Sequence, residues 1–115
     1  MPEPIYKICP RALWKEAERV GRFNGAPVDR ADGFIHFSTS AQVRETAARH
    51  FAGADDLVLI EVDPAAVDGE LRWEPSRGGA LFPHLYGSLP LSAVRRVEPL
   101  PLAADGTHLF PADIA

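Results

Sequence analysis

The sequence predicts a single α+β domain over residues 1–115, with a mostly antiparallel β-sheet and two main helices. The predicted elements begin in the order strand, helix, strand, helix and then continue as a run of strands, an arrangement typical of α+β folds. A regular alternation of strands and helices is absent, which disfavours a doubly wound parallel sheet. A chain of 115 residues also fits one hydrophobic core.

The first strand and the first helix are separated by a proline. Residues 5–8 predict a short strand, which Pro10 ends. Residues 11–20 predict a helix, because proline is favoured at a helix start and Gly21 is a stop signal. The apolar residues that form one face of this helix are Leu13, Ala17 and Val20.

A loop, a second strand and a second helix are predicted next. Residues 23–32 are predicted as a loop because of their turn residues, which are Asn24, Gly25 and Pro27. Residues 33–38 predict a strand. Residues 39–50 predict a helix, because Thr39 and Gln42 have the spacing of a capping box. The buried stripe of this helix is predicted to be Val43, Ala47 and Phe51.

The second half of the chain is predicted to be mostly strand. Residues 57–62 begin with four consecutive apolar residues, which indicates a central strand covered on both faces. Residues 64–67 predict a short turn or helical piece, and residues 75–79 a loop. Three further strands are predicted at residues 71–74, 81–86 and 93–100. The tail, residues 101–115, is predicted to be irregular and to pack as a surface strap.

Composition and charge exclude several classes of partner. The formal net charge is −4 and the basic residues are scattered among acidic ones, so we expect no nucleic-acid partner. Cys9 is the only cysteine, which excludes an intrachain disulfide and indicates the cytoplasm. The longest apolar run, residues 57–60, is too short to span a bilayer, so we expect no membrane partner.

The first of three segments that could carry chemistry is the strand-to-helix junction around His36. On a strand, His36 shares a face with Phe34 and Ser38. Three hydroxyl residues follow at the helix start, Ser38, Thr39 and Ser40, where unpaired amides can hold an anion such as phosphate. Helix capping is the favoured explanation of these hydroxyls, because such caps are common, and His36 could be a hydrogen-bonded core residue.

The second segment surrounds Glu74. Arg72 and Glu74 share one strand face and Trp73 lies on the other. A carboxylate at the entrance of a glycine-rich loop, close to Arg72 and Arg77, could orient a ribose hydroxyl or act as a general base. The alternative is a solvated ion pair beside a hairpin turn at Gly78-Gly79.

The third segment places Phe82, His84 and Tyr86 on one strand face. Buried histidine and tyrosine need partners for their polar tips, so this stripe is more typical of a pocket wall than of a dry core. His36, His84 and Glu74 could in principle form a two-histidine, one-carboxylate iron site. Three dispersed residues are weak support for a metal, and we predict none.

The same segments carry a resemblance to the family called domain of unknown function 952. It extends from about residue 5 to residue 97. The residues that carry it are Tyr6-Lys7, Trp14, the run Asp32-Gly33-Phe34-Ile35-His36-Phe37-Ser38-Thr39, Trp73-Glu74 with Gly78-Gly79, and Phe82-Pro83-His84-Leu85-Tyr86-Gly87. The family has no assigned activity.

More distantly, the chain resembles ADP-ribosyltransferases, which bind NAD in a cleft between two small antiparallel sheets. This resemblance implies a split sheet and makes NAD the only cofactor to be considered. Ser38 and Thr39 would then fix the pocket wall, with Phe37 or His36 against the nicotinamide. A glutamate, Glu74 or Glu98, would hold the ribose 2′-hydroxyl and stabilise an oxocarbenium-like transition state. The first strand departs from that pattern, because it offers only Lys7 where those enzymes supply histidine or arginine.

These observations leave three functional hypotheses. The first is a domain that binds a nucleotide-like or other small polar ligand. Its ligand-binding residues would be His36, Ser38, Thr39, Trp73, Arg77, His84 and Tyr86. The second is an enzyme that cleaves or transfers ADP-ribose from NAD, with Glu74 and His36 as catalytic residues. The third is a non-catalytic accessory protein, in which the stripe of Phe82, His84 and Tyr86 would be partly exposed in the monomer. We expect a monomer or a weak homodimer.

Overall fold

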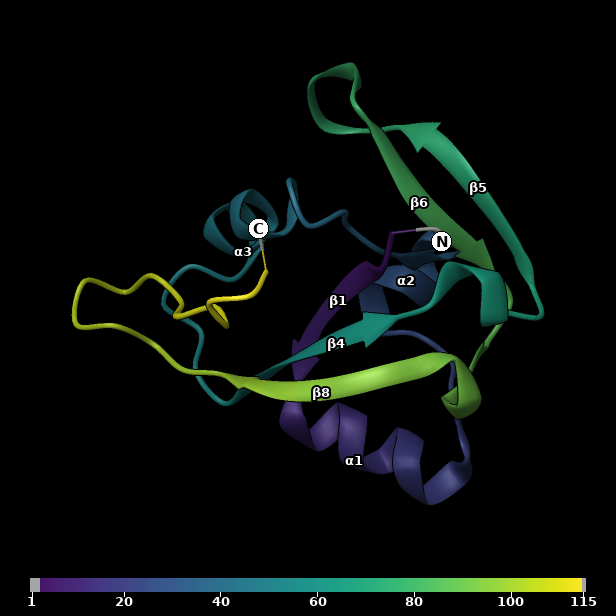
Figure 1. The fold of residues 1–115 in the computed structure, drawn as a ribbon, viewed down its shortest axis with the longest axis horizontal. Coiled ribbons are helices and arrows are strands. Elements are labelled where there is room, and N and C mark those ends of the chain that lie inside the picture. The colour runs from purple at the N-terminus through teal and green to yellow at the C-terminus, as the bar shows by residue number, and fades with distance from the viewer. Residues whose placement is uncertain (1–2, 115) are drawn as a thin grey trace.

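Antiparallel sheets carry the fold, and helices pack against them (Figure 1). A computed structural model describes residues 3–114 and, at Arg77, the backbone alone. The strands are β1 Ile5–Pro10, β2 Arg22–Phe23, β3 Ile35–His36, β4 Leu57–Val62, β5 Glu70–Pro75, β6 Leu81–Tyr86, β7 Leu89–Pro90 and β8 Val94–Leu100. The helices are α1 Arg11–Val20, α2 Pro27–Asp32 and α3 Val43–His50, with short 3₁₀ turns η1 Pro64–Ala66, η2 Arg77–Gly79 and η3 Leu91–Ala93. The predicted α+β class with antiparallel strands is confirmed.

Strand β4 is the centre of a three-stranded sheet with the order β1-β4-β8. Its side chains alternate between two hydrophobic clusters. Val58, Ile60 and Val62 join the cluster that contains Trp14 of α1. Leu57 and Leu59 join the cluster that contains Val43 and Ala47 of α3. The prediction of a central strand buried on both faces is therefore confirmed.

A second three-stranded sheet, with the order β3-β6-β5, is attached to the free edge of β1. The attachment is a backbone bridge between Tyr6 and Ser38. The Tyr6 amide donates to the Ser38 carbonyl at 2.8 Å, and the Ser38 amide donates to the Tyr6 carbonyl at 2.9 Å. The two sheets therefore meet at residues that the sequence assigned to its first two strands. A two-stranded sheet of β2 and β7 completes the framework.

The prediction of a loop over residues 23–32 is wrong in its second half, which is helix α2. Pro27 occupies the start of this helix, where its fixed φ is favourable and its missing amide is not needed. The Asp29 carboxylate accepts a hydrogen bond from the Ala26 amide at 2.8 Å. Gly33 ends the helix with a φ of 88°, a left-handed conformation that favours glycine. Proline is common both in turns and at helix starts, and at Pro27 it starts a helix.

The second predicted helix is shorter than residues 39–50, because α3 begins at Val43. Gln42 nevertheless accepts a hydrogen bond from the Thr39 amide at 3.0 Å, which is one half of the predicted capping box. The predicted strand 33–38 is reduced to β3 and the isolated bridge at Ser38. In α1, Val20 is exposed and Trp14 is buried, so the apolar face differs from the predicted one.

The tail after β8 is irregular and packs as a strap, as predicted. Ile114 is buried in the cluster beneath α3, and Phe110 packs against the same cluster. The Arg44 guanidinium donates to the Ile114 carbonyl at 2.7 Å and lies over the Phe110 ring. Contacts of Phe110 and Ile114 therefore fix the end of the tail on α3.

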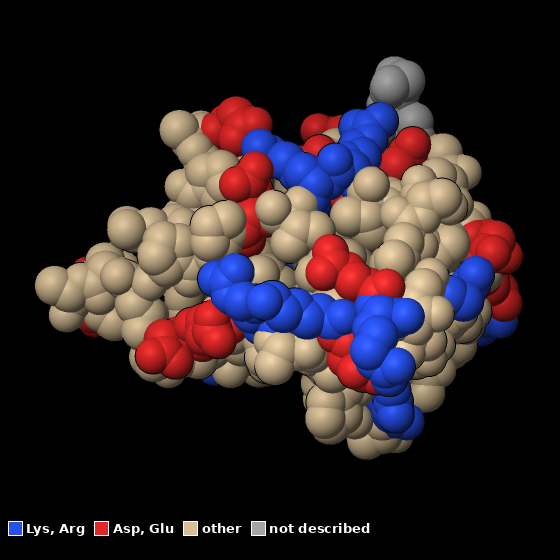
Figure 2. All heavy atoms as spheres, turned by 90° about the horizontal axis from the view of Figure 1, so that it is seen from below, with Lys and Arg blue, Asp and Glu red and all other residues tan. Residues whose placement is uncertain are grey.

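Acidic and basic side chains lie beside one another on the face seen in Figure 2. The ion pairs of the protein include Arg96 with Asp113 at 2.9 Å and Arg22 with Asp68 at 3.1 Å. None of the helices within residues 3–114 is long and apolar enough to cross a membrane.

We expect Cys9 to be unreactive in the folded protein. It is fully buried, and this burial raises the pKa of its thiol to about 12. An ordinary cysteine has a pKa of about 8.5, so the thiolate fraction near neutral pH falls by about three thousandfold. The rate of reaction with an aromatic disulfide reagent should therefore be at least that much lower in native than in urea-unfolded protein. Equal rates in the two states would show that Cys9 is exposed.

Candidate functional site

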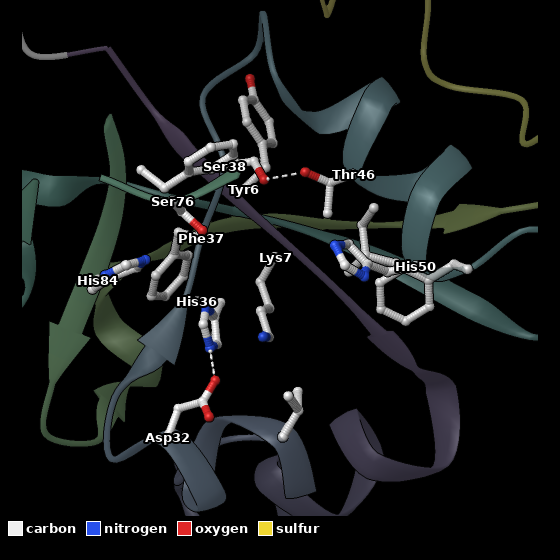
Figure 3. Close-up of a pocket in the computed structure, with 14 residues that line it drawn as sticks. Tyr6, Lys7, Asp32, His36, Phe37, Ser38, Thr46, His50, Ser76 and His84 are labelled. Carbon is white, nitrogen blue, oxygen red and sulfur yellow. Dashed lines mark hydrogen bonds and ion pairs between the residues drawn. The ribbon is translucent and has the colours of Figure 1, made fainter. Parts of the chain in front are cut away.

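A cavity of about 460 Å³ lies where the two three-stranded sheets meet (Figure 3). Its walls come from β1, β3 and the residues after it, β6, α2, α3 and the loop after β5. The polar lining residues used below are Lys7, Asp32, His36, His50, Ser76 and His84. Phe37, Phe51 and Phe82 supply flat apolar walls. A few convergent polar groups in an apolar cavity are typical of a small-molecule site.

Glu74 fixes the ring of His84 by a hydrogen bond on the side away from the cavity. One carboxylate oxygen, Oε1, accepts hydrogen bonds from His84 Nδ1 at 2.8 Å and from the Tyr86 hydroxyl at 2.7 Å. These two bonds, the one to His84 first, hold the pKa of the Glu74 carboxyl below its usual range. Glu74 is therefore ionised at neutral pH and can only accept, so Nδ1 of His84 must donate.

The other ring nitrogen of His84, Nε2, has no hydrogen-bond partner among the described residues. His84 is buried, and Nε2 has no hydrogen bond within the part of the chain that the structure describes. Its ring stacks on Phe34 at 4.1 Å and meets His36 edge-on at 5.1 Å, and Figure 3 shows a ring nitrogen directed toward the cavity. Because Nδ1 carries the hydrogen in the neutral ring, Nε2 presents a lone pair. A buried polar atom without a partner is uncommon and indicates a missing one.

His36 lies directly across the sheet from His84. The two residues are register partners in β3 and β6. Nε2 of His36 pairs with Asp32 at 2.7 Å, because Asp32 ends α2 four residues earlier. The ring also packs on Phe34 at 4.6 Å, consistent with the predicted shared face. The two histidines are thus held by different carboxylates on one side of the cavity.

A buried ion pair between Lys7 and Asp29 supports this arrangement. Lys7 Nζ lies 2.8 Å from Asp29 Oδ2, and the side chains are 7% and 1% exposed. Asp29 also accepts from the His36 amide at 3.1 Å. The carboxylate thereby connects α2, β1 and β3, and it fixes the backbone from which the His36 ring projects.

Three of the predicted site residues line the cavity: His36, Ser38 and His84. Ser38 is engaged in a hydroxyl–hydroxyl contact with Thr46 at 2.8 Å, so it connects β3 to α3. Glu74 and Tyr86 lie behind His84, outside the lining. Trp73 is 48% exposed on the other strand face, opposite Pro83.

The remaining predicted residues lie elsewhere. Thr39 is outside the lining and contributes its backbone to the turn before α3. Glu98 is on β8 beside Arg96, in the other sheet. The side chain of Arg77, predicted as a ligand contact, lies outside the described part of the chain. Among residues 3–114 as described, no group of three metal-ligating side chains comes together.

Sequence reasoning missed several residues of the site. Asp29 lies in the segment predicted as a loop, and no local pattern distinguishes a buried aspartate from a solvated one. Asp32 had a usable signal, because it precedes His36 by four residues across a glycine turn. His50 and Ser76 line the cavity from a helix end and a loop, where polar residues are ordinary.

We expect Glu74 to contribute to stability in a defined pH window. Its folded-state pKa is below the unfolded value of about 4.3, so the unfolded chain binds the proton more tightly. Its contribution is therefore present above about pH 4.3 and is lost as the pH falls through the folded-state pKa. Urea unfolding of Glu74→Gln across this window should give a flatter pH dependence than wild type. Identical pH profiles would contradict the hydrogen-bonded carboxylate, and Tyr86→Phe should give an intermediate profile.

Comparisons with known proteins agree with this fold. The family described as a protein of unknown function (DUF952) matches residues 8–97. The crystal structure of protein CC0527 from Caulobacter crescentus superposes with a TM-score of 0.88 at 51% identity, covering 92% of this chain and 93% of that chain. The solution NMR structure of CC0527 superposes with a TM-score of 0.81 at 52% identity, covering 90% of each chain. No functionally curated protein matches.

Proposed function

The chain belongs to the DUF952 family of proteins of unknown function, and from its site we propose that it binds a small nucleotide-like molecule in the cavity between its sheets. His84 accepts a hydrogen bond from a hydroxyl group of this ligand, such as a ribose hydroxyl. The single observation that carries the proposal is the unpartnered Nε2 of His84. A hydroxyl is the matching donor because the neutral ring offers a lone pair there.

The walls of the cavity support a planar group beside that hydroxyl. Phe37 and Phe82 lie near His84, while Phe51 and His50 line the wall on α3. Flat rings of this kind pack well on a heterocyclic base. The volume of about 460 Å³ lies within the range of small-molecule sites. NAD and ADP-ribose are the first compounds to test, since the resemblance to ADP-ribosyltransferases points to them.

An amide-resolved NMR titration with NAD, ADP-ribose and nicotinamide tests this proposal. We expect saturable shifts at residues 36–38, 46, 50, 51, 82 and 84, which line the cavity. Tail amides such as those of Asp105 and Thr107 serve as an internal control, because they lie outside this cavity. The absence of saturable shifts at millimolar concentrations of all three compounds would reject a nucleotide-like ligand.

A second candidate function is an enzyme that cleaves NAD, and the Glu74–His84 pair favours it. A carboxylate that orients a histidine is a common general-base arrangement. Here Glu74 would orient His84, and Nε2 of His84 would take the proton from a ribose hydroxyl or from water. This candidate requires nicotinamide release that Glu74→Gln abolishes. Wild-type protein without turnover would reject it and leave binding alone.

The accessory-protein hypothesis depended on an exposed stripe of Phe82, His84 and Tyr86. Phe82 and His84 are buried within the chain. Tyr86 is half-buried, with its hydroxyl on Glu74 and the Arg72 guanidinium 4.8 Å from its ring centre. Burial of two of the three rings weighs against this stripe as a surface for a partner protein.

A further inference from the structure

Strand β5 is the outer strand of its sheet. It pairs with β6 on one side only, in the order β3-β6-β5, and Figure 1 shows it at the rim of the molecule. An unpaired strand edge presents amides and carbonyls that can pair with another strand, and proteins commonly protect such edges. The described part of the chain places no strand on the outer side of β5.

The outward-facing backbone groups of β5 belong to Leu71 and Trp73. The Pro83 carbonyl accepts from the Phe37 amide at 3.0 Å, so the backbone of Pro83 faces β3. Trp73 is the register partner of Pro83 on β5. Trp73 and Pro83 therefore form a non-hydrogen-bonded pair, in which the backbone amide and carbonyl groups of the two residues point away from each other. The amide and carbonyl of Trp73 thus point to the outer side of β5. By alternation Leu71 does the same, while Arg72 and Glu74 bond to β6.

The side chains at this edge are apolar on one face. Trp73 is 48% exposed and Leu81, on the neighbouring strand, is 51% exposed. Pro75 is exposed on the same face. An exposed tryptophan on an open strand edge is the feature that strand pairing would cover.

We propose that β5 pairs antiparallel with β5 of a second copy of this chain, about a two-fold axis at Trp73. Strand charge selects this register, because it places Arg72 of each copy opposite Glu74 of the other. An axis at Arg72 would instead place Glu70 opposite Glu74 and Arg72 opposite Arg72. An axis at Glu74 would bring the two Glu74 carboxylates together. An axis at Leu71 would place Arg72 opposite Glu70 but also Glu74 opposite Asp68. Each of these three alternatives puts like charges opposite each other.

The proposed pairing has a definite set of bonds. The two Trp73 residues exchange two backbone hydrogen bonds. The Leu71 amide of each copy donates to the Pro75 carbonyl of the other, and Pro75 donates nothing in return because it has no amide hydrogen. Glu74 uses Oε1 for both His84 and Tyr86, which leaves Oε2 outside those two bonds for Arg72 of the other copy. An interface of this size is small, and the dimer is therefore weak.

Sedimentation equilibrium over micromolar to millimolar protein tests the association. Wild type should shift from monomer to dimer mass as its concentration rises. Trp73→Pro removes the central amides without touching the β5–β6 ladder, so this variant should stay monomeric throughout. Trp73→Tyr keeps the amide and an aromatic ring, and it should dimerise. Wild type that stays monomeric at millimolar concentration, or Trp73→Pro that associates like wild type, would overturn the proposal.

Two further measurements test the register. Arg72→Glu places like charges opposite each other and should weaken association at least tenfold relative to Arg72→Lys. Hydrogen exchange of the Leu71 and Trp73 amides should slow as protein concentration rises, whereas the β6-bonded amides of Arg72 and Glu74 should be protected at all concentrations. A dimer whose concentration-dependent protection lies on another element would refute pairing through β5.

Discussion

Replacing Lys7 by methionine is expected to lower the free energy of unfolding by about 3–5 kcal/mol, because it leaves the carboxylate of Asp29 buried without its cation. Lys7 Nζ and Asp29 Oδ2 lie 2.8 Å apart, and the two side chains are 7% and 1% exposed. Urea unfolding measures this loss. Lys15→Met is the matched control, since Lys15 is exposed and its replacement should change stability by no more than about 0.5 kcal/mol.

A double variant separates two contributions to this loss of stability: the unpaired buried charge of Asp29 and the missing side-chain contacts of Lys7. In Lys7→Met with Asp29→Asn, the site carries no charge, and the amide oxygen can keep one of the two backbone bonds now made to Ala26 and His36. This variant should be more stable than Lys7→Met alone. Equal stability of Lys7→Met and Lys15→Met would show that the ion pair is solvated in solution.

The second large effect is expected at His84. His84→Phe keeps a flat ring against Phe34 but removes Nε2 and Nδ1. ADP-ribose should then bind about 10–100-fold more weakly, which corresponds to the loss of one buried hydrogen bond. Titration calorimetry measures the change.

His108→Phe provides the same chemical change outside the cavity. Nε2 of His108 pairs with the Ala54 carbonyl at 2.8 Å, near the tail. Its replacement should leave ADP-ribose affinity within about twofold of wild type, which is well below the tenfold change that about 1.4 kcal/mol of binding free energy produces. If both variants bind ADP-ribose as wild type does, His84 is not a ligand contact.

Elements set by local pattern were predictable from the sequence. The helix over residues 11–20 and the strands over 57–62 and 81–86 have their predicted limits, because proline, glycine and apolar runs mark them directly. Helix α2 was missed because Pro27 serves both turns and helix starts, and the bond from the Ala26 amide to Asp29 has no distinct sequence signal.

Individual residues of the site could be predicted from the sequence, but the contacts between residues on different elements could not. Strand alternation places His84 and Tyr86 on one face, and both bond to Glu74. Strand pairing brings His36 across from His84, and pairing registers are set by the whole sheet rather than by either strand. The Lys7–Asp29 pair depends on contacts between segments 22 residues apart, which no single-sequence pattern encodes.

The side-chain ¹⁵N spectrum of His84 during a titration with ADP-ribose tests the central claim most directly. Before ligand is added, the ring should carry its hydrogen on Nδ1, which donates to Glu74, and Nε2 should be bare. Saturating ligand should then shift Nε2 by forming a new hydrogen bond while Nδ1 keeps its hydrogen. A hydrogen on Nε2 in the free protein, or an Nε2 signal unchanged at millimolar ADP-ribose, would contradict the claim.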